Sequence, residues 1–393
     1  MRNYHGVTVV PIIVDKTTNK IKRTLDTQHN LILDVGLNRL ASTTISQCLA
    51  RCAIGTGTLA TNRGTQGIFV NKTGSTVTTT GSFFTNDDAL FKRVLQLSDE
   101  TVCRILTVDS ATQATVSDDV STLTNGAAII WNTEQTTLET QLMVSATVNT
   151  SKATYNGTVI TTPELSGVKT INIDRFRTFQ FDFEDESHTI TEAGWTWDEV
   201  AGTPQLFGRV VFSNPVVITP HDRLLIKVIF NHKFPIPDYV ANDPYFAANG
   251  TWDATPVVSN RLGISSVNSN GTLNDVDTSD NDFLSMLEPC EAKIIMAFVN
   301  SDNTDLKQLT VNANSYIANS YQRTWPAVAV SDDFATSIKS LRFRFLSDPT
   351  NPESATNGLT MTYTAAQAKA DQTVITTAFS TGWDRKLPAF PQG

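Results

Sequence analysis

The chain has 393 residues and a formal net charge of −9; 40% of the residues are hydrophobic and only 18% are charged. Its 57 Thr, 28 Ser and 28 Asn favour strands and turns, so the composition predicts a β-rich protein with many loops. The acidic balance speaks against nucleic-acid binding through phosphate contacts, and no apolar run approaches the roughly 20 residues of a membrane helix. The first residues lack a signal-peptide core, so we expect synthesis in a cytosol.

The first third of the chain contains one strong strand signal and one helix signal. Residues 8–14 form an extended apolar run in which Pro11 removes a donor, which favours an edge strand or a docking arm. Leu33, Leu37, Leu40 and Ala41 follow helical spacing. Residues 61–82 are rich in Thr, Gly and Asn and are interpreted as a flexible loop or a weak hairpin.

Strand signals dominate the remainder. Phe179, Phe181 and Phe183 alternate with polar residues, which marks one buried strand face. Residues 206–236 carry the strongest hydrophobic signal and predict two strands at the centre of the fold. Residues 237–285 are rich in Asn, Asp, Ser and Gly, as expected of a surface insertion. Further strands are predicted at 293–299, 341–346, 359–364 and 373–379.

These signals predict an all-β chain, an antiparallel β-sandwich of jelly-roll-like type with a short N-terminal helix, an extended N-terminal arm and long loop insertions. The predicted parts are an arm at 1–29, a sandwich core of 30–236 with 286–385, a surface insertion at 237–285 and a C-terminal tail at 386–393 that runs free or packs on a neighbour. No fixed-period repeat is present, which disfavours a propeller or solenoid.

Two motifs have simple structural interpretations. Gly55-Thr56-Gly57 lacks both the Lys-Ser/Thr ending of a phosphate loop and the third glycine of a dinucleotide fingerprint, so a tight turn is expected and no cofactor is assigned. Cys48 and Cys52 are four residues apart, but no histidine lies near them to complete a zinc site. We therefore interpret the cysteines as buried apolar residues.

A weak calcium pattern lies within the acidic run near 280. Asp277, Ser279, Asn281 and Glu288 fall at positions one, three, five and twelve of a calcium loop. The sixth position, which requires glycine for the sharp turn, is Asp282. A solvated acidic loop is the simpler interpretation, and no metal is assigned.

Carboxylates and tryptophans supply the remaining candidates. Asp182 and the acidic run 184–186 would suit the paired acids of a glycoside hydrolase, although charges at a strand end are commoner. Trp195 and Trp197 share one strand face and, with Trp252, are candidates for glycan or subunit contacts. No residue is assigned a catalytic role, and we expect that the protein is not an enzyme.

Three stretches, in this order, resemble virion proteins of tailed bacteriophages. The first is residues 30–41 followed by Ile54-Gly55-Thr56-Gly57-Thr58. The second is 190–195 with Leu206-Phe207-Gly208-Arg209, 215–218 and His221-Asp222-Arg223-Leu224. The third is 359–363 with Gly382-Trp383-Asp384-Arg385. Residues 237–285 and 300–340 depart from the resemblance.

The resemblance implies a structural tail, baseplate or fibre protein that assembles as a trimer, hexamer or ring with itself and with other virion proteins. Such packing suits a Thr-rich β surface with loops and arms, and residues 8–14 would add a strand to a neighbour's sheet. The alternative is a receptor- or carbohydrate-binding tail protein that contacts a host-surface glycan. A polysaccharide-degrading enzyme and a capsid-decorating protein are further readings.

Overall fold

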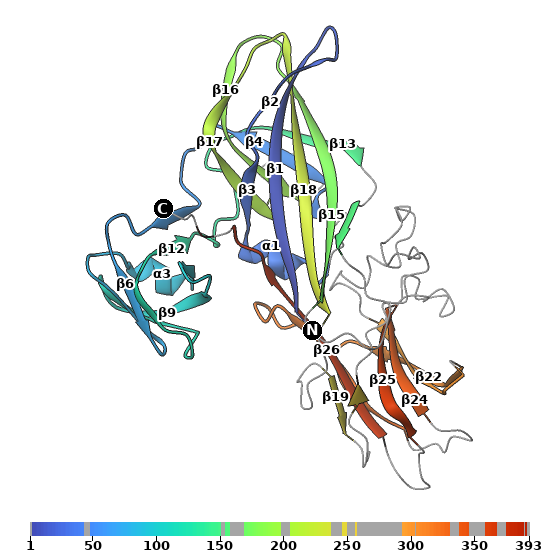
Figure 1. Ribbon diagram of the computed structural model, residues 1–393. Helices are drawn as coiled ribbons and strands as arrows, with labels where there is room; N and C mark the ends of the chain where they lie inside the picture. Colours follow the sequence, from blue (N-terminus) through green and yellow to red (C-terminus); the bar gives the residue numbers. More distant parts are fainter. Residues whose placement is uncertain are drawn as a thin grey trace.

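The computed structural model describes residues 2–42, 48–150, 154–157, 169–197, 205–236, 246–249, 256–257, 293–302, 304–330, 338–345, 358–367, 375–388 and 390. Three sheets account for the architecture, and they form three lobes in Figure 1. The all-β prediction is confirmed. No helix in the described ranges is long and apolar enough to cross a membrane.

The central lobe is a sheet that closes on itself. Each of its eight strands pairs antiparallel with the next, and the last pairs with the first. In ring order the strands are β1 (Arg2–Asp15), β18 (Asp222–Ile236), β15 (Lys169–Asp182), β13 (Gln141–Thr150), β4 (Arg51–Gly55), β16 (His188–Thr196), β17 (Gly208–Ile218) and β3 (Gln28–Ile32). We call this ring the closed sheet. Its opposite walls face each other across a shared core, as the layers of a sandwich do.

The strand predicted to be a docking arm is built into the closed sheet. β1 pairs with β18 from Tyr4 to Asp15, and its other side pairs with β3, with β2 (Ile21–Thr24) and with β26 (Ile375–Arg385). The carbonyl of Pro11 accepts a hydrogen bond from Leu25, so its nitrogen faces the gap between the β3 and β2 pairings. The expectation of an arm donated to a neighbour is corrected, because residues 2–15 find their partners within the chain.

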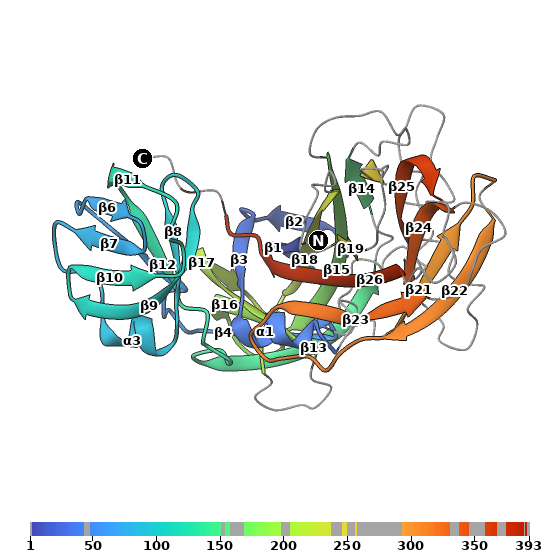
Figure 2. The ribbon, with the colours of Figure 1, turned by 90° about the horizontal axis from the view of Figure 1, so that it is seen from below.

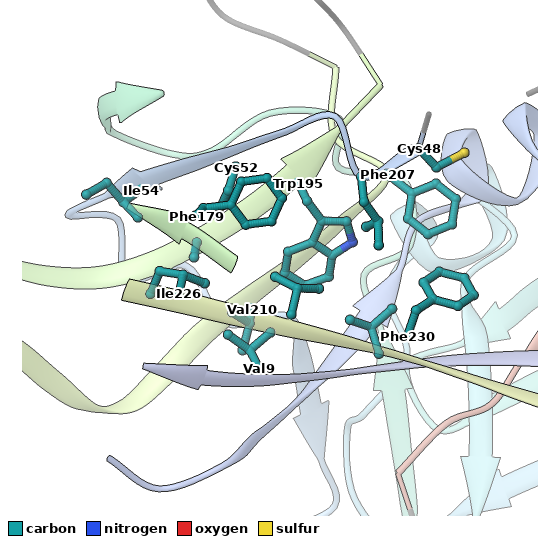
Figure 3. Close-up of a cluster of buried hydrophobic side chains, with 14 of the residues drawn as sticks. Val9, Cys48, Cys52, Ile54, Phe179, Trp195, Phe207, Val210, Ile226 and Phe230 are labelled. Atoms are coloured by element: carbon teal, nitrogen blue, oxygen red, sulfur yellow. The ribbon is translucent and has the colours of Figure 1, made fainter. Parts of the chain in front are cut away.

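Alternating apolar residues from facing strands fill the closed sheet. Phe179 and Phe181 are fully buried and Phe183 nearly so, which confirms the predicted buried face. Ile226 and Phe230 of β18 alternate in the same way, and Figure 3 shows them around Trp195. Burying each such side chain contributes roughly 1.5–3 kcal/mol.

Residues 62–131 form a second lobe, which we call the inserted module. Its strands are β5 (Asn62–Gly64), β6 (Val70–Thr73), β7 (Thr76–Thr79), β8 (Val94–Leu97), β9 (Val102–Ser110), β10 (Gln113–Val116), β11 (Leu123–Gly126) and β12 (Ala128–Trp131), with helix α3 (Asn86–Leu90). Segment 123–131 pairs with β6 at one end and with β5 and β8 at the other, so this sheet also wraps around a core. Of the two structures predicted for 61–82, the hairpin is present, since β6 pairs antiparallel with β7. It is not a weak surface feature, because Val70 and Val77 are fully buried in that core.

The third lobe contains the C-terminal strands, which lie opposite the module in Figure 2. One sheet contains β20 (Pro256–Val257), β25 (Gly358–Gln367), β24 (Ile338–Phe345), β21 (Lys293–Val299) and β22 (Asp305–Asn312). Outside it, β19 (Phe246–Asn249) and β23 (Gln322–Val330) pair with β26, and β14 (Thr154–Gly157) pairs with β15. Two short strands therefore lie in the predicted insertion 237–285, whose other residues lie outside the described ranges.

The predicted helix is α1 (Asp34–Arg39), with Gly36 and Leu37 buried. The predicted tail is corrected where it is described. Phe390 is buried and Leu387 packs against an apolar cluster that includes Val94 and Trp131 of the inserted module. These residues therefore pack on their own chain.

Candidate functional site: the polar attachment of the inserted module

Two connecting segments join the inserted module to the closed sheet, and both pass one buried ion pair. Residues 56–61 lead out from β4, and residues 132–140 return to β13. Glu192 on β16 faces Arg209 on β17; their carboxylate and guanidinium are 2.8 Å apart and neither side chain is exposed. Such a buried pair is stable only when its remaining hydrogen-bonding capacity is also satisfied.

The two connecting segments supply most of those hydrogen-bond partners. Glu192 accepts the N–H groups of Gly57 at 3.1 Å, Glu139 at 3.2 Å and Thr140 at 2.9 Å. Arg209 donates to the carbonyl of Leu59 at 2.8 Å and to Oε1 of Gln135 at 3.0 Å. The ion pair therefore holds the outgoing and the returning segment together. We call Gly57, Glu139, Thr140, Glu192 and Arg209 the linker site.

A second carboxylate ties the two segments directly to each other. Glu139 of the returning segment accepts the N–H groups of Thr58 at 2.6 Å and Leu59 at 2.7 Å in the outgoing one. These backbone hydrogen bonds lower the pKa of Glu139. Asn132 adds bonds to the carbonyls of Ala60 and Thr61. The attachment is therefore a paired, cross-linked stem.

The glycines of Gly55-Thr56-Gly57, at the end of β4, allow this close approach. A Cβ on Gly55 would lie 2.2 Å from the carbonyl oxygen of Thr140, and one on Gly57 would lie 2.4 Å from both Glu139 Cβ and the Glu192 carboxylate. Real Cβ atoms do not approach other atoms this closely. The expected tight turn is not present here, because β4 ends at Gly55 and residues 56–60 continue from it without a turn. The segment instead delivers the backbone N–H of Gly57 to a buried carboxylate.

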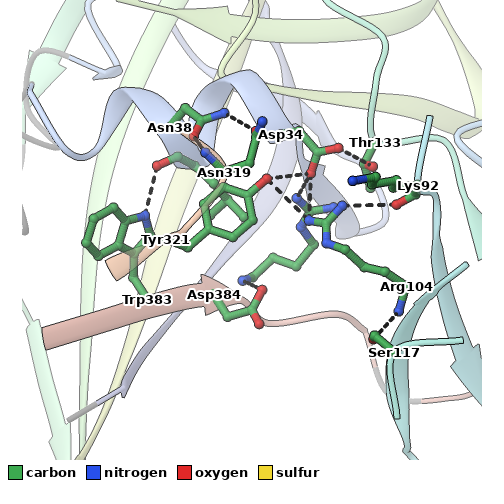
Figure 4. Close-up of polar contacts among 12 residues, drawn as sticks. Asp34, Asn38, Lys92, Arg104, Ser117, Thr133, Asn319, Tyr321, Trp383 and Asp384 are labelled. Carbon is green, nitrogen blue, oxygen red and sulfur yellow. Dashed lines mark hydrogen bonds and ion pairs between the residues drawn. The ribbon is translucent and has the colours of Figure 1, made fainter. Parts of the chain in front are cut away.

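A second polar cluster joins all three lobes at Asp34, at the start of α1 (Figure 4). Its carboxylate contacts Arg104 of the inserted module at 2.9 Å and Arg385 of β26. It also accepts hydrogen bonds from Tyr321 at 3.1 Å and from Thr133 at 2.7 Å. We call these five residues the Asp34 junction. Because Thr133 lies in the returning segment, the junction reinforces the linker site.

The electrostatics of the junction favour a charged Asp34. Burial opposes ionisation of this carboxyl, but Arg385 and Arg104 outweigh it and lower its pKa to about 2. Burial likewise opposes the charge on Arg104, while Asp34 raises its pKa. Burial and the negative charge of Asp34 raise the pKa of the Tyr321 hydroxyl, which stays a donor. The junction is therefore a fixed set of charges and hydrogen bonds at neutral pH.

The other end of α1 is held by the loop before β23. Asn38 accepts hydrogen bonds from the Tyr316 hydroxyl and the Asn319 N–H, both at 2.7 Å. The indole N–H of Trp383 donates to the carbonyl of Leu37 at 2.8 Å. The short helix is thus held in part by residues 278 to 346 positions away.

The structure corrects the tryptophan candidates. Trp195 is completely buried in the core, so it cannot contact a glycan or another subunit. Trp197 is partly buried against the same core, with the guanidinium of Arg39 over its ring at 5.3 Å. Trp252 lies outside the described residues.

The calcium candidates Asp277, Ser279, Asn281 and Glu288 also lie outside the described ranges. Where the structure is described, no group of three or more His, Cys, Asp and Glu side chains could hold a metal ion. Cys48 and Cys52 are buried as predicted, and burial strongly raises the pKa of the Cys52 thiol.

The acidic run at the end of β15 is a surface feature. Asp182 forms an ion pair with Arg223 at 2.9 Å, and residues 184–186 are exposed. The carboxylate of Asp182 therefore helps to hold β15 to β18.

In the sequence, Asp34, Gly57, Glu192, Arg209 and Arg385 lie within the stretches that resemble virion proteins, and Gly57 also lies within a motif expected to form a turn. Sequence reasoning missed that they meet in two clusters that attach one module. A buried carboxylate requires partners, but β16 also contains His188 and three threonines, so the sequence does not mark Glu192 as buried. No known protein family, curated protein or solved structure matches this chain.

Proposed function

We propose that the chain is a structural component of a tailed-phage virion, located in the tail, baseplate or fibre-attachment region. It acts by assembling with copies of itself and with neighbouring virion proteins. The observation that carries this proposal is that residues from distant stretches of the chain meet in the two polar clusters described above. Stretches that resemble virion proteins, far apart in the sequence, supply Asp34, Gly57, Glu192, Arg209 and Arg385 to the linker site and the Asp34 junction. A structural framework shared with those virion proteins would explain why these stretches meet.

The surface of the inserted module supports an assembly role. Of the eleven large hydrophobic residues that are exposed in the described ranges, six belong to the module. They are Phe69, Leu90, Phe91, Val102, Leu106 and Val120. Exposed apolar side chains concentrated on one part of a protein are typical of protein–protein contacts. In the proposed assembly, some of these side chains contact a neighbouring subunit, and the cross-linked stem holds the module in place.

The first test is the composition of the particle. Quantitative mass spectrometry of purified particles should find the chain in several copies, and its absence from the particle contradicts the proposal. Light scattering after size exclusion then separates the positions, since a trimer favours a fibre and a hexamer or larger ring favours a baseplate or collar.

A pair of matched variants tests the surface. Leu90→Glu places a charge on a module residue that is 71% exposed, and Ile317→Glu does so at a residue outside the module that is 74% exposed. Incorporation into particles should fall for Leu90→Glu and remain unchanged for Ile317→Glu. Because Trp195 is buried, it is no longer a candidate for glycan binding. The glycan-binding alternative would be favoured if a binding screen found a specific glycan and the chain were absent from purified particles.

A further inference from the structure

A short segment after β26 crosses from the closed sheet to the inserted module. We call residues 386–388 and 390 the strap. At its start, the N–H of Lys386 donates to the carbonyl of His5 at 2.6 Å. Leu387 packs against the apolar cluster between the module and the closed sheet, and Phe390 is only 9% exposed. The strap therefore covers a specific face of the module.

The module recognises the backbone of the strap through two side chains. Gln96 is buried, and its Nε2 donates to the carbonyl of Pro388 at 2.9 Å. Its Oε1 accepts the indole N–H of Trp131 at 3.1 Å, which fixes the orientation of the amide. Glu100 accepts the N–H of Phe390 at 2.9 Å. One donor and one acceptor, with a covered aromatic ring, are the elements of a peptide-binding site.

Glu100 lies in the turn between β8 and β9, where its N–H donates to the carbonyl of Leu97 at 3.0 Å. Glu100 has a φ of +67°, a left-handed conformation that glycine and asparagine adopt much more readily than glutamate. Three-residue hairpin loops commonly place their last residue in this region. Here the contact that glutamate makes, and that a shorter side chain would lose, is the hydrogen bond to the strap.

We propose that the face of the inserted module around Gln96 and Glu100 is a peptide-binding site whose ligand is the strap, bound in cis as a detachable segment. Its ligand class is an extended peptide with an aromatic residue two positions after a proline. Release of the strap uncovers Gln96 and leaves the linker site and the Asp34 junction intact, because Arg385 precedes the strap. The proposal is independent of the virion role.

Hydrogen exchange of the full chain provides the main test. The amide of Phe390, which donates to Glu100, should exchange at least about tenfold more slowly than in a synthetic peptide of the same sequence, the protection expected from about 1.4 kcal/mol of binding. Glu100→Asn suits the left-handed backbone and removes the reach of the carboxylate, so it should return the exchange to the rate of the free peptide. The matched control Asp99→Asn changes an exposed neighbour that caps Thr101 and should leave the protection unchanged.

The second test supplies the ligand in trans. A variant that ends at Arg385 is mixed with a synthetic peptide of residues 384–393, and the indole signal of Trp131 is followed by NMR. The signal should shift saturably, and a peptide with Phe390→Ala should require a concentration about tenfold higher. Exchange of the Phe390 amide at the free-peptide rate in the full chain, or protection of this amide that survives Glu100→Asn, overturns the proposal. A folded truncated variant whose Trp131 signal does not change at millimolar peptide overturns it as well.

Discussion

The carboxylate of Glu192 and the guanidinium of Arg209 lie 2.8 Å apart, and neither side chain is exposed to solvent. The two residues are 17 positions apart on neighbouring strands, yet most of their other partners come from segments more than 50 residues distant. The pair therefore acts less as a bond between two strands than as the point where both ends of the inserted module are fixed.

Glu192→Gln should lower the free energy of unfolding by about 3–5 kcal/mol, because it leaves the guanidinium of Arg209 buried without its counter-charge. Replacing both residues by methionine restores stability at many buried ion pairs. Here the double variant should remain destabilised, because the N–H groups of Gly57, Glu139 and Thr140 lose their acceptor. Urea unfolding of the single and double variants measures this, and full recovery in the double variant would contradict the assigned role.

Gly57→Ala should destabilise the chain by more than about 2 kcal/mol, because its Cβ would overlap the Glu192 carboxylate and Glu139. Gly64 in β5 is the matched control. The nearest atom to a Cβ at Gly64 is 3.8 Å away, so Gly64→Ala should change stability by less than about 0.5 kcal/mol. Thermal unfolding of both variants compares them; equal effects would mean that the close approach at Gly57 is unimportant.

Asp34→Asn should cost about 2–4 kcal/mol, since it leaves Arg104 and Arg385 facing each other without a carboxylate. The loss should also accelerate hydrogen exchange in β9, which carries Arg104. Asp26→Asn removes an exposed carboxylate and serves as the control. If β9 exchanges equally in both variants, the junction does not hold the module.

Acid should destabilise the chain through His5 before it affects the carboxylates. Burial lowers the pKa of His5 from 6.5 to about 3, so below pH 6.5 the unfolded state binds a proton that the folded state does not. The free energy of unfolding should fall by up to about 1.4 kcal/mol for each pH unit below 6.5. Asp34, whose pKa is also lowered, adds to this loss only below about pH 4.

Urea unfolding between about pH 5 and 6.5 isolates the histidine contribution. His5→Gln should flatten this slope, whereas His221→Gln, at an exposed position, should leave it unchanged. A slope that persists in His5→Gln would place the titrating group elsewhere.

The sequence predicted the elements whose signals are local. Phe179, Phe181 and Phe183 alternate over one strand, and the leucines of α1 follow helical spacing, so both were identified correctly. The inserted module was missed because its strands β5, β6 and β7 have only three or four residues, many of them Thr. Its buried Lys72 also reads as a surface residue, although its ammonium donates to two carbonyls and contacts Asp118.

The candidate sites could not be assembled from the sequence. Gly57 and Glu192 are 135 residues apart and Asp34 and Arg385 are 351 apart, and no local pattern encodes which distant partner a polar residue will contact. Pro11 illustrates a related limit. Its missing N–H correctly indicated an unpaired position, but only the pairing of β2 and β3 shows that this position is a gap within the closed sheet.

The parallel pairing of β1 with β26 has a mechanical consequence. Arg2 lies opposite Gly382 and His5 lies opposite Arg385, so a pull applied at Arg2 and at Arg385 drags the two strands past each other lengthwise. In this shear geometry the inter-strand hydrogen bonds carry the load together, whereas a pull across the strands would open them one at a time. This pairing is therefore most resistant to a tensile force applied between Arg2 and Arg385.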